Sequence, residues 1–350
     1  MADFFPSVAV VILNWNGRSF LEKFLPFVIA TDYPNLKIYV ADNASDDDSA
    51  AFIKREYPHI NIIQNSGNLG FAGGYNEALK KVEAAYYVLL NSDVEVTKDW
   101  ILPIIRLMHN NPVIGACQPK ILSCQDRNQF EYAGAAGGWM DHWGYSFCRG
   151  RIFDTTEADT GQYDNAAKIF WASGAAFFIK AALYHQAGGL DEYFFAHMEE
   201  IDLCWRLQRM GYQVWCCPQS VVYHVGGGSL AQGSPYKMFL NFRNNLIMMH
   251  KNLSGIERVT KLAIRFMLDG FAAFRSIVKG YPSELKIILK AHGAYYRWLF
   301  QNKKRSSTLN KRYIPIVKMK NLSGTYFHTI AWKYFAKGKQ TFSSLKIKEK

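Results

Sequence analysis

The chain has 350 residues, of which 49% are hydrophobic, and a formal net charge of +12, so it can form one large or two modest domains with a buried core. Its longest apolar runs fall short of the roughly 20 residues that a membrane-spanning helix needs, and its N-terminus lacks the features of a secretory signal. We therefore expect a cytoplasmic protein, neither secreted nor transmembrane. The six cysteines form no CxxC pair, which argues against a zinc cage and a disulfide framework.

The positive charge belongs to the C-terminal part of the chain. Residues 251–350 hold 22 Lys/Arg and four Asp/Glu, whereas residues 1–250 hold 19 Lys/Arg and 25 Asp/Glu. A basic segment of this kind is compatible with an anionic membrane surface or with nucleic acid as partner, and composition alone does not choose between them.

The first 120 residues alternate strand-like and helix-like segments. Short runs rich in Val, Ile and Tyr, bounded by Asn, Asp, Gly or Pro, occupy residues 7–14, 37–42, 60–65, 86–91 and 114–119. Amphipathic helical patterns lie between them. This alternation predicts an α/β fold with a mostly parallel sheet and helices on both faces.

Polar residues follow four successive predicted strands. The loops begin with Asn14–Gly17, Asp42–Ser45, Asn65–Asn68 and Asn91–Asp93. Turn chemistry accounts for any one of these loops, but four in succession predict a ligand site at the carboxyl edge of the sheet. Gly17 is the only glycine in the first turn and no GxxxxGK[ST] motif occurs, so neither a Rossmann dinucleotide site nor a P-loop is predicted.

The middle of the chain has weaker patterns. Residues 120–165 are rich in Gly and aromatic residues without periodicity, which favours a long loop with short strands over the cleft. A strand and a helix follow "FWASG", a helix begins at "EEIDLCWR", and a strand "QVWCCP" precedes "YHVGGGS".

Residues 258–281 have the pattern of a basic amphipathic helix. The apolar positions are Ile264, Met267, Leu268, Phe271, Phe274 and Val278, and the basic positions are Lys261, Arg265, Arg275 and Lys279. Basic clusters at 303–305 and 311–312 continue this charge. Two interpretations stay open: a helix packed on the domain, or a helix in a membrane interface. We predict a catalytic domain over 1–245 and a basic helical extension over 246–350.

Six motifs, "VVILNWNG", "VADNASDD", "NSGNLGFAGGYN", "LLNSDVEV", "FFAHMEEIDLCWR" and "YHVGGGS", occur in this order. Together, over residues 7–245, they resemble the family 2 glycosyltransferases of GT-A fold, in particular the rhamnosyltransferase-like branch. The resemblance implies inverting transfer of rhamnose or a hexose from a dTDP- or UDP-sugar. It implies a glycan or lipid-linked acceptor in bacterial surface polysaccharide synthesis, with the basic tail at the inner face of the cytoplasmic membrane. Nucleic acid is not expected as a partner.

The resemblance also assigns a divalent cation, Mg²⁺ or Mn²⁺. Charge develops on the diphosphate as the sugar leaves, and a cation held by a carboxylate neutralises it. In the family, an Asp-x-Asp-like motif after the fourth strand holds the cation, and here it falls on Asn91-Ser92-Asp93. The resemblance implies that Asp93 is a metal ligand, that Asn91 contacts the sugar or ribose, and that His224 of "YHVGGGS" is a second ligand.

Donor-binding positions follow from the same motifs. The resemblance carries this role to Asn14, Asp42, Asn68, Gly73, Asn76, Asn91, Ser92, Asp93, Trp171 and Gly174. Asp42 is expected to hydrogen-bond the base of the nucleotide, although an Asx-turn would also explain it. Trp171 is expected to offer a stacking surface, although tryptophan is equally a core residue. Arg243 is expected to meet the diphosphate.

The acceptor hydroxyl must lose a proton as it attacks, which requires a carboxylate. The family places an aspartate at the position of Glu200, so Glu200 is the expected base, with geometry in doubt because its side chain is one methylene longer. Glu199 is the alternative base, and Asp202, which can pair with Arg206 on a helix, is expected to be structural or orienting. Acids at a helix start also simply complement its dipole.

Two other functions stay open. A nucleotidyltransferase of related fold would carry a glycine-rich, basic N-terminal signature, and this N-terminus offers only Arg18 and Lys23 near Gly17. A non-catalytic protein that binds nucleotide sugars or nucleic acid is compatible with the basic tail, but no recognised nucleic-acid motif is present.

Overall fold

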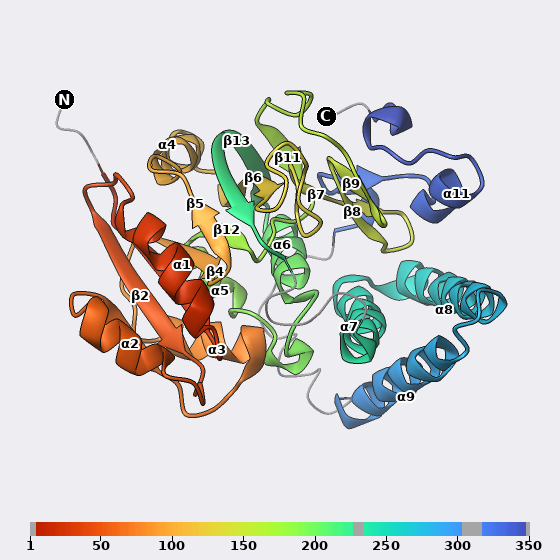
Figure 1. Ribbon diagram of the computed structural model, residues 1–350. Coiled ribbons are helices and arrows are strands. Elements are labelled where there is room, and N and C mark those ends of the chain that lie inside the picture. Colours follow the sequence, from red (N-terminus) through yellow and green to blue (C-terminus); the bar gives the residue numbers. More distant parts are fainter. Residues whose placement is uncertain (1–4, 227–233, 303–316, 348–350) are drawn as a thin grey trace.

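A computed structural model describes residues 5–226, 234–302 and 317–347. A nine-stranded central sheet has the order β11-β13-β6-β12-β4-β1-β2-β3, with β5 paired to β13, and a smaller five-stranded sheet has the order β10-β9-β8-β7-β14 (Figure 1). The central strands are β1 (Val8–Asn14), β2 (Leu36–Asp42), β3 (Asn61–Gln64), β4 (Tyr86–Asn91), β5 (Val94–Val96), β6 (Ile114–Ser123), β11 (Ala167–Ile169), β12 (Ala176–Lys180) and β13 (Gln213–His224). The smaller sheet contains β7 (Gly138–Asp141), β8 (Ser146–Cys148), β9 (Arg151–Ile152), β10 (Thr155–Thr156) and β14 (Thr325–Tyr326).

Helices surround both sheets. They are α1 (Arg18–Ile29), α2 (Ser49–Glu56), α3 (Gly70–Leu79), α4 (Ile101–Asn110), α5 (Ala181–Ala187), α6 (Glu199–Arg209), α7 (Pro235–Asn252), α8 (Gly255–Val278), α9 (Ser283–Asn302) and α11 (Ile330–Phe335). Short 3₁₀ turns are η1 (Glu192–Phe194), η2 (Met319–Asn321) and η3 (Ser343–Leu345).

The predicted α/β fold class is confirmed. Strands β3, β2, β1 and β4 form a parallel block, and each of the first four predicted strands lies within one residue of its observed bounds. The sheet becomes mixed beyond β4, because β12 runs antiparallel to both β4 and β6. Short strands β7–β10 occupy the region 120–165, as predicted.

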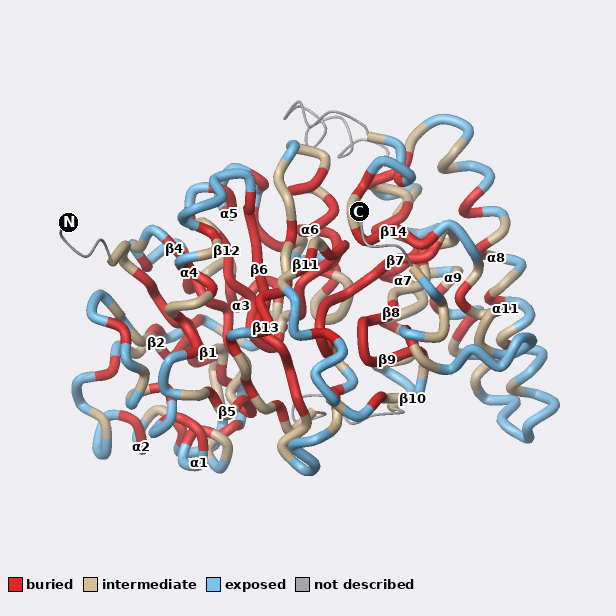
Figure 2. The backbone as a smooth tube through the Cα atoms, turned by 90° about the horizontal axis from the view of Figure 1, so that it is seen from above, coloured by how far each residue is buried: buried red, intermediate tan, exposed pale blue. Residues whose placement is uncertain are grey.

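Strand β1 is buried on both faces (Figure 2). Val8, Val10 and Ile12 belong to the core that includes α1, α2 and α4, whereas Ala9 and Val11 belong to the core that includes α3, α5 and α6. Successive strand residues face opposite sides of a sheet, so the continuous apolar run in β1 reflects two helical layers. This burial places the polar strand ends at one edge of the sheet.

The C-terminal part is not the separate helical extension that we predicted. The predicted boundary at residue 245 falls inside α7. Residues 317–347 return to the smaller sheet, where β14 pairs in parallel with β7, and Phe342 donates its backbone N–H to Glu157. The basic clusters at 303–305 and 311–312 lie outside the described residues. In the described parts of the chain, no helix combines the length and the apolar character needed to cross a bilayer.

Candidate active site

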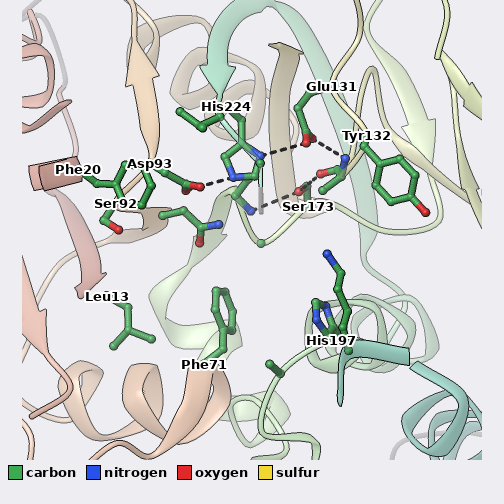
Figure 3. A pocket seen from close by; sticks show the side chains of 18 of the residues that line it. Leu13, Phe20, Phe71, Ser92, Asp93, Glu131, Tyr132, Ser173, His197 and His224 are labelled. Carbon is green, nitrogen blue, oxygen red and sulfur yellow. Dashed lines mark hydrogen bonds and ion pairs between the residues drawn. The ribbon is translucent and has the colours of Figure 1, made fainter. Parts of the chain in front are cut away.

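A cavity of about 890 Å³ lies at the carboxyl edge of the central sheet (Figure 3). Residues from the loops that follow β1, β2, β3 and β4 line it, as the polar strand ends predicted. The opposite walls come from residues 123–133, 173–175 and 195–200, from the end of β13, and from the first turn of α7. The cavity is large enough for a nucleotide-sized ligand.

Asp93 and His224 meet in this cavity, although 131 residues separate them. Antiparallel pairing of β5 with β13 sets Val94 opposite His224, and the backbone N–H of Val225 donates to the carbonyl of Asp93 at 3.1 Å. His224 Nε2 consequently lies 3.1 Å from Asp93 Oδ1. The structure brings together the two predicted metal ligands, while their ligand role stays a prediction.

Glu131 is a third member of this cluster, and the sequence patterns missed it. Its Oε1 lies 3.4 Å from His224 Nδ1, so the imidazole ring lies between two carboxylates (Figure 3). Each of the three residues is at most 6% exposed. Burial alone would lower the pKa of His224, but the charges of Asp93 and Glu131 outweigh it and raise this pKa to about 10. Glu131 therefore orients the ring, as carboxylates behind metal-binding histidines do.

The Asp93–His224 pair fits a divalent cation held jointly with a diphosphate. The pair offers one carboxylate to the cavity, and a cation on Nε2 of His224 would take the place of the proton that the raised pKa of this ring retains. Among the residues that the structure describes, no group of three His, Cys, Asp or Glu side chains is arranged to hold a metal by itself. Mg²⁺ commonly takes only one or two protein ligands and completes its shell with phosphate oxygens and water, so two protein ligands are sufficient here.

The other side of the cavity carries the predicted base at the start of α6. The preceding backbone is strained, with positive φ at Phe195 (63°), His197 (69°) and Met198 (76°). Such residues persist only where their surroundings hold them. Here Asn244 of α7 holds them, because its Nδ2 lies 2.8–3.0 Å from the carbonyl oxygens of Phe194, Ala196 and His197.

Three buried polar atoms of this segment lack hydrogen-bond partners among the described residues: His197 Nε2, Glu199 Oε2 and Glu200 Oε2. All three residues line the cavity. Burial raises the pKa of Glu200 to about 7, and burial together with the Glu200 charge raises the pKa of Glu199 well above its usual range. Burial, followed by the charge of Lys237, lowers the pKa of His197 to about 4. A carboxylate that titrates near neutrality suits a general base.

Asp202 lies behind Glu200 and does not line the cavity. Its carboxylate accepts hydrogen bonds from Arg206 Nε (2.8 Å), Lys251 Nζ (3.2 Å) and Asn252 Nδ2 (2.7 Å). Arg206 also donates to the carbonyls of Ala187 and Gly189. Asp202 therefore ties α6 to α7 and to the turn after α5, which agrees with its predicted orienting role.

Asp202→Ala is expected to destabilise the protein by roughly 3–5 kcal/mol, because it removes a fully buried carboxylate that pairs with Arg206 and Lys251. Burial would raise the pKa of Asp202, but the charges of Lys251 and Arg206 outweigh it and lower this pKa. Urea unfolding measures the loss. Glu77→Ala, which breaks an exposed pair with Lys80, is the control and should cost at most about 1 kcal/mol. Equal losses in the two variants would contradict the role of Asp202.

Two predicted donor contacts, Asn14 and Asp42, lie behind the cavity wall. Asp42 is 2% exposed, and its oxygens accept hydrogen bonds from Asn14, Ser45 and Gln64. Asp42 thereby organises the loops after β1 and β2. The neighbouring Asn43 lines the cavity instead, so a contact between Asp42 and the base stays a prediction.

Three further predicted donor contacts are placed away from the cavity, and the structure corrects them. Asn76 accepts from Tyr184 Oη (2.6 Å) and donates to the Leu190 carbonyl (2.9 Å), so it ties α3 to the segment before η1. Trp171 is 4% exposed and donates to the carbonyl of Trp139. Gly73 packs on Leu69 within α3. These residues support the wall from behind.

The remaining predicted donor residues do line the cavity: Asn68, Asn91, Ser92, Asp93 and Gly174. Arg243 is directed elsewhere, since it donates to the carbonyls of Tyr193 and Phe194 at 3.1 Å. Lys237, from the first turn of the same helix, lines the cavity. The cation that α7 offers to a ligand is therefore Lys237.

Gly70→Ala is expected to disturb the base segment. Gly70 has φ +69°, and an added Cβ would lie 2.6 Å from the backbone oxygen of Phe195. Strain and overpacking together should cost roughly 2–4 kcal/mol of stability, and displacement of Phe195 should weaken donor binding. Gly67→Ala is the matched control, because no atom lies within 4 Å of its added Cβ. Thermal melting and calorimetric titration with UDP measure both effects, and equal behaviour of the two variants would exclude the predicted strain.

Comparison with known proteins agrees with this geometry. Residues 9–178 match the model of glycosyl transferase family 2. The chain is 25% identical over 295 residues to the N-acetylglucosaminyl-diphospho-decaprenol L-rhamnosyltransferase of Mycobacterium tuberculosis, covering 79% of this chain and 92% of that protein.

Solved structures share the fold at low identity. The mannosyltransferase PcManGT of Pyrobaculum calidifontis, in complex with GDP-Man and Mn²⁺, aligns with a TM-score of 0.53 at 14% identity, covering 84% of this chain and 88% of its own. Residues 1–349 of S. aureus TarS, in complex with UDP-GlcNAc, align with a TM-score of 0.56 at 14% identity, covering 87% of this chain and 83% of the TarS chain. The matched model, the mycobacterial relative and the order of the six motifs support a family 2 glycosyltransferase, and the solved structures show the GT-A fold.

Proposed function

We propose that this glycosyltransferase is inverting and metal-dependent, and that it transfers rhamnose or a hexose from a dTDP- or UDP-sugar to a glycan or lipid-linked acceptor. The reaction would belong to bacterial surface polysaccharide synthesis at the inner face of the cytoplasmic membrane. The observation that carries the proposal is a single cavity that holds both the Asp93–His224 pair and Glu200. The mycobacterial relative, whose name specifies a diphospho-decaprenol acceptor and rhamnose, supports the choice of substrates.

Residues on the two sides of the cavity have different proposed roles. Asp93 and His224 would hold Mg²⁺ or Mn²⁺, which neutralises charge on the leaving diphosphate. Asn91 and Ser92 adjoin Asp93 in the turn after β4 and offer hydrogen bonds to the donor. Glu200 takes the proton of the acceptor hydroxyl, and attack from the side opposite the leaving group inverts the anomeric carbon. Burial and the charge of Glu200 raise the pKa of Glu199, which disfavours a second negative charge next to the base.

A donor panel tests this proposal. The full chain is incubated with dTDP-rhamnose, UDP-glucose, UDP-GlcNAc or GDP-mannose, with Mg²⁺ or Mn²⁺, and with a short-chain polyprenyl-diphosphate-linked GlcNAc as acceptor. We expect one donor to give a product of inverted configuration, detected by mass spectrometry and NMR. Absence of both transfer and binding for every donor would overturn the proposal, and release of pyrophosphate from a nucleoside triphosphate would instead indicate a nucleotidyltransferase.

A further inference from the structure

Helix α8 carries many of its large apolar residues on its outer face. Six of them are between 63% and 77% exposed: Ile256, Val259, Met267, Phe271, Phe274 and Val278. Their spacing of three, four or eight residues keeps them on one face of a helix. We call this face the outer stripe. At 1.5 Å per residue it runs for roughly 33 Å.

The inner face of α8 carries charge. Lys261, Arg265 and Asp269 are each at most 5% exposed. Arg265 Nε pairs with Asp269 Oδ1 at 2.7 Å, and His292 of α9 pairs with the other oxygen of Asp269 at 3.1 Å. Lys261 donates to the carbonyl of His142 at 2.8 Å.

The inner face of α8 is therefore docked through these polar contacts together with Leu262 and Phe266, while six large apolar side chains face outward. This arrangement is the reverse of an ordinary surface helix, and a contiguous exposed apolar face of this length marks an interaction surface.

The charge around the outer stripe indicates the partner. Between residues 255 and 301, the exposed charged side chains are all basic: Arg275, Lys279, Lys286, Lys290 and Arg297. The acids of this stretch are at least partly covered, Asp269 by Arg265 and His292, and Glu257 by Lys261. A second copy of the chain would bring this positive field against itself, whereas an anionic bilayer complements it.

We propose that the outer stripe of α8 inserts into the interface of an anionic lipid bilayer, with the basic residues around it on the phosphate groups. The helix lies parallel to the membrane, since no described helix can span it. Helix α7 lines the active-site cavity at its first turn and packs against both α8 and α9, and in Figure 1 it lies between them and the rest of the domain.

Helix α7 thus links the active-site cavity to the helix that carries the outer stripe. The purpose of this surface, access to a lipid-linked acceptor, rests on the proposed function, but the binding itself requires no turnover.

Vesicle flotation of the full chain tests the proposal without any sugar nucleotide. We expect the protein to float with phosphatidylglycerol vesicles, at least tenfold less with phosphatidylcholine vesicles, and less as salt rises. The double variant Phe271→Glu, Phe274→Glu should lose at least nine-tenths of the flotation. Phe27→Glu changes an exposed phenylalanine of α1 (43% exposed) and should float like the unchanged protein.

Two readouts separate this proposal from its alternatives. Both residues of the double variant are exposed, so its melting temperature and its turnover of a water-soluble acceptor should be unchanged. Failure of the proposed transfer reaction would leave the vesicle result as it stands. Unaltered flotation of the double variant, or absence of flotation of the unchanged chain, would overturn the proposal. So would a dimer in sedimentation that the double variant abolishes, because the stripe would then bind a second copy.

Discussion

Asp93→Ala is expected to reduce turnover by about 10³-fold, because it removes the carboxylate that lies 3.1 Å from His224 and is the proposed ligand of the cation. Loss of an electrostatic group of this kind typically costs two to three orders of magnitude. His224 keeps Glu131 as a partner at 3.4 Å, so we expect the fold to persist and circular dichroism to be unchanged.

A second readout separates loss of the cation from loss of chemistry. Titration calorimetry with UDP should show tighter binding in the presence of Mn²⁺ for the unchanged protein, and no effect of Mn²⁺ for Asp93→Ala. Asp126→Ala is the matched control, since Asp126 is an exposed acid that lines the same cavity without a histidine partner. Full turnover in Asp93→Ala, or a Mn²⁺ effect that survives it, would refute the assignment of Asp93.

Glu200→Gln should lower kcat by roughly 10²–10⁴-fold, because glutamine cannot accept the proton of the acceptor. Glu199→Gln is the discriminating control. Burial and the charge of Glu200 raise the pKa of Glu199 and favour its protonated form, which an amide resembles, so the kcat of Glu199→Gln should stay within about tenfold. If the two variants behave in the opposite way, Glu199 is the base. Glu200→Asp should retain part of the activity, since it restores the aspartate that the family carries.

The pH dependence follows from the raised pKa of Glu200. The base must be ionised, so kcat should fall tenfold per pH unit below pH 7 and level off above it. The unfolded carboxyl releases its proton near pH 4 and the folded one near pH 7. The folded state therefore binds more protons between these values, and stability falls as pH rises through this window. Glu200→Gln removes the cost of ionising this buried carboxyl. At pH 8 the variant should therefore be more stable than the unchanged protein by roughly 1–3 kcal/mol, measured by urea unfolding. Lower stability of the variant would contradict the burial argument.

Local patterns were sufficient for the elements of the catalytic half. A parallel strand covered on both faces is apolar at every position, as in Val8–Ile12, and the chain leaves the sheet at the first polar residue. The carboxyl ends of such strands meet at one edge, so the loops at Asn14, Asn68 and Asn91 could be placed together from sequence. The extension after residue 245 was predicted less well, because pairing of β14 with β7 joins segments about 180 residues apart and leaves no local signal.

The sequence by itself determined the alternation of strands and polar loops, the family resemblance, and the choice of Asp93, His224 and Glu200 as candidate residues for one site, because these depend on periodicity and on motifs in a fixed order. Tertiary structure alone decided that Glu131 faces His224, that Asn76 and Trp171 support the wall instead of lining it, and that α8 turns its charged face inward. The amide of Asn76, the indole of Trp171 and the inner face of α8 are buried because the folded chain supplies hydrogen-bond or ion-pair partners at those places. Those partners come from distant segments, as His292 does for Asp269, and neighbours in sequence cannot predict them.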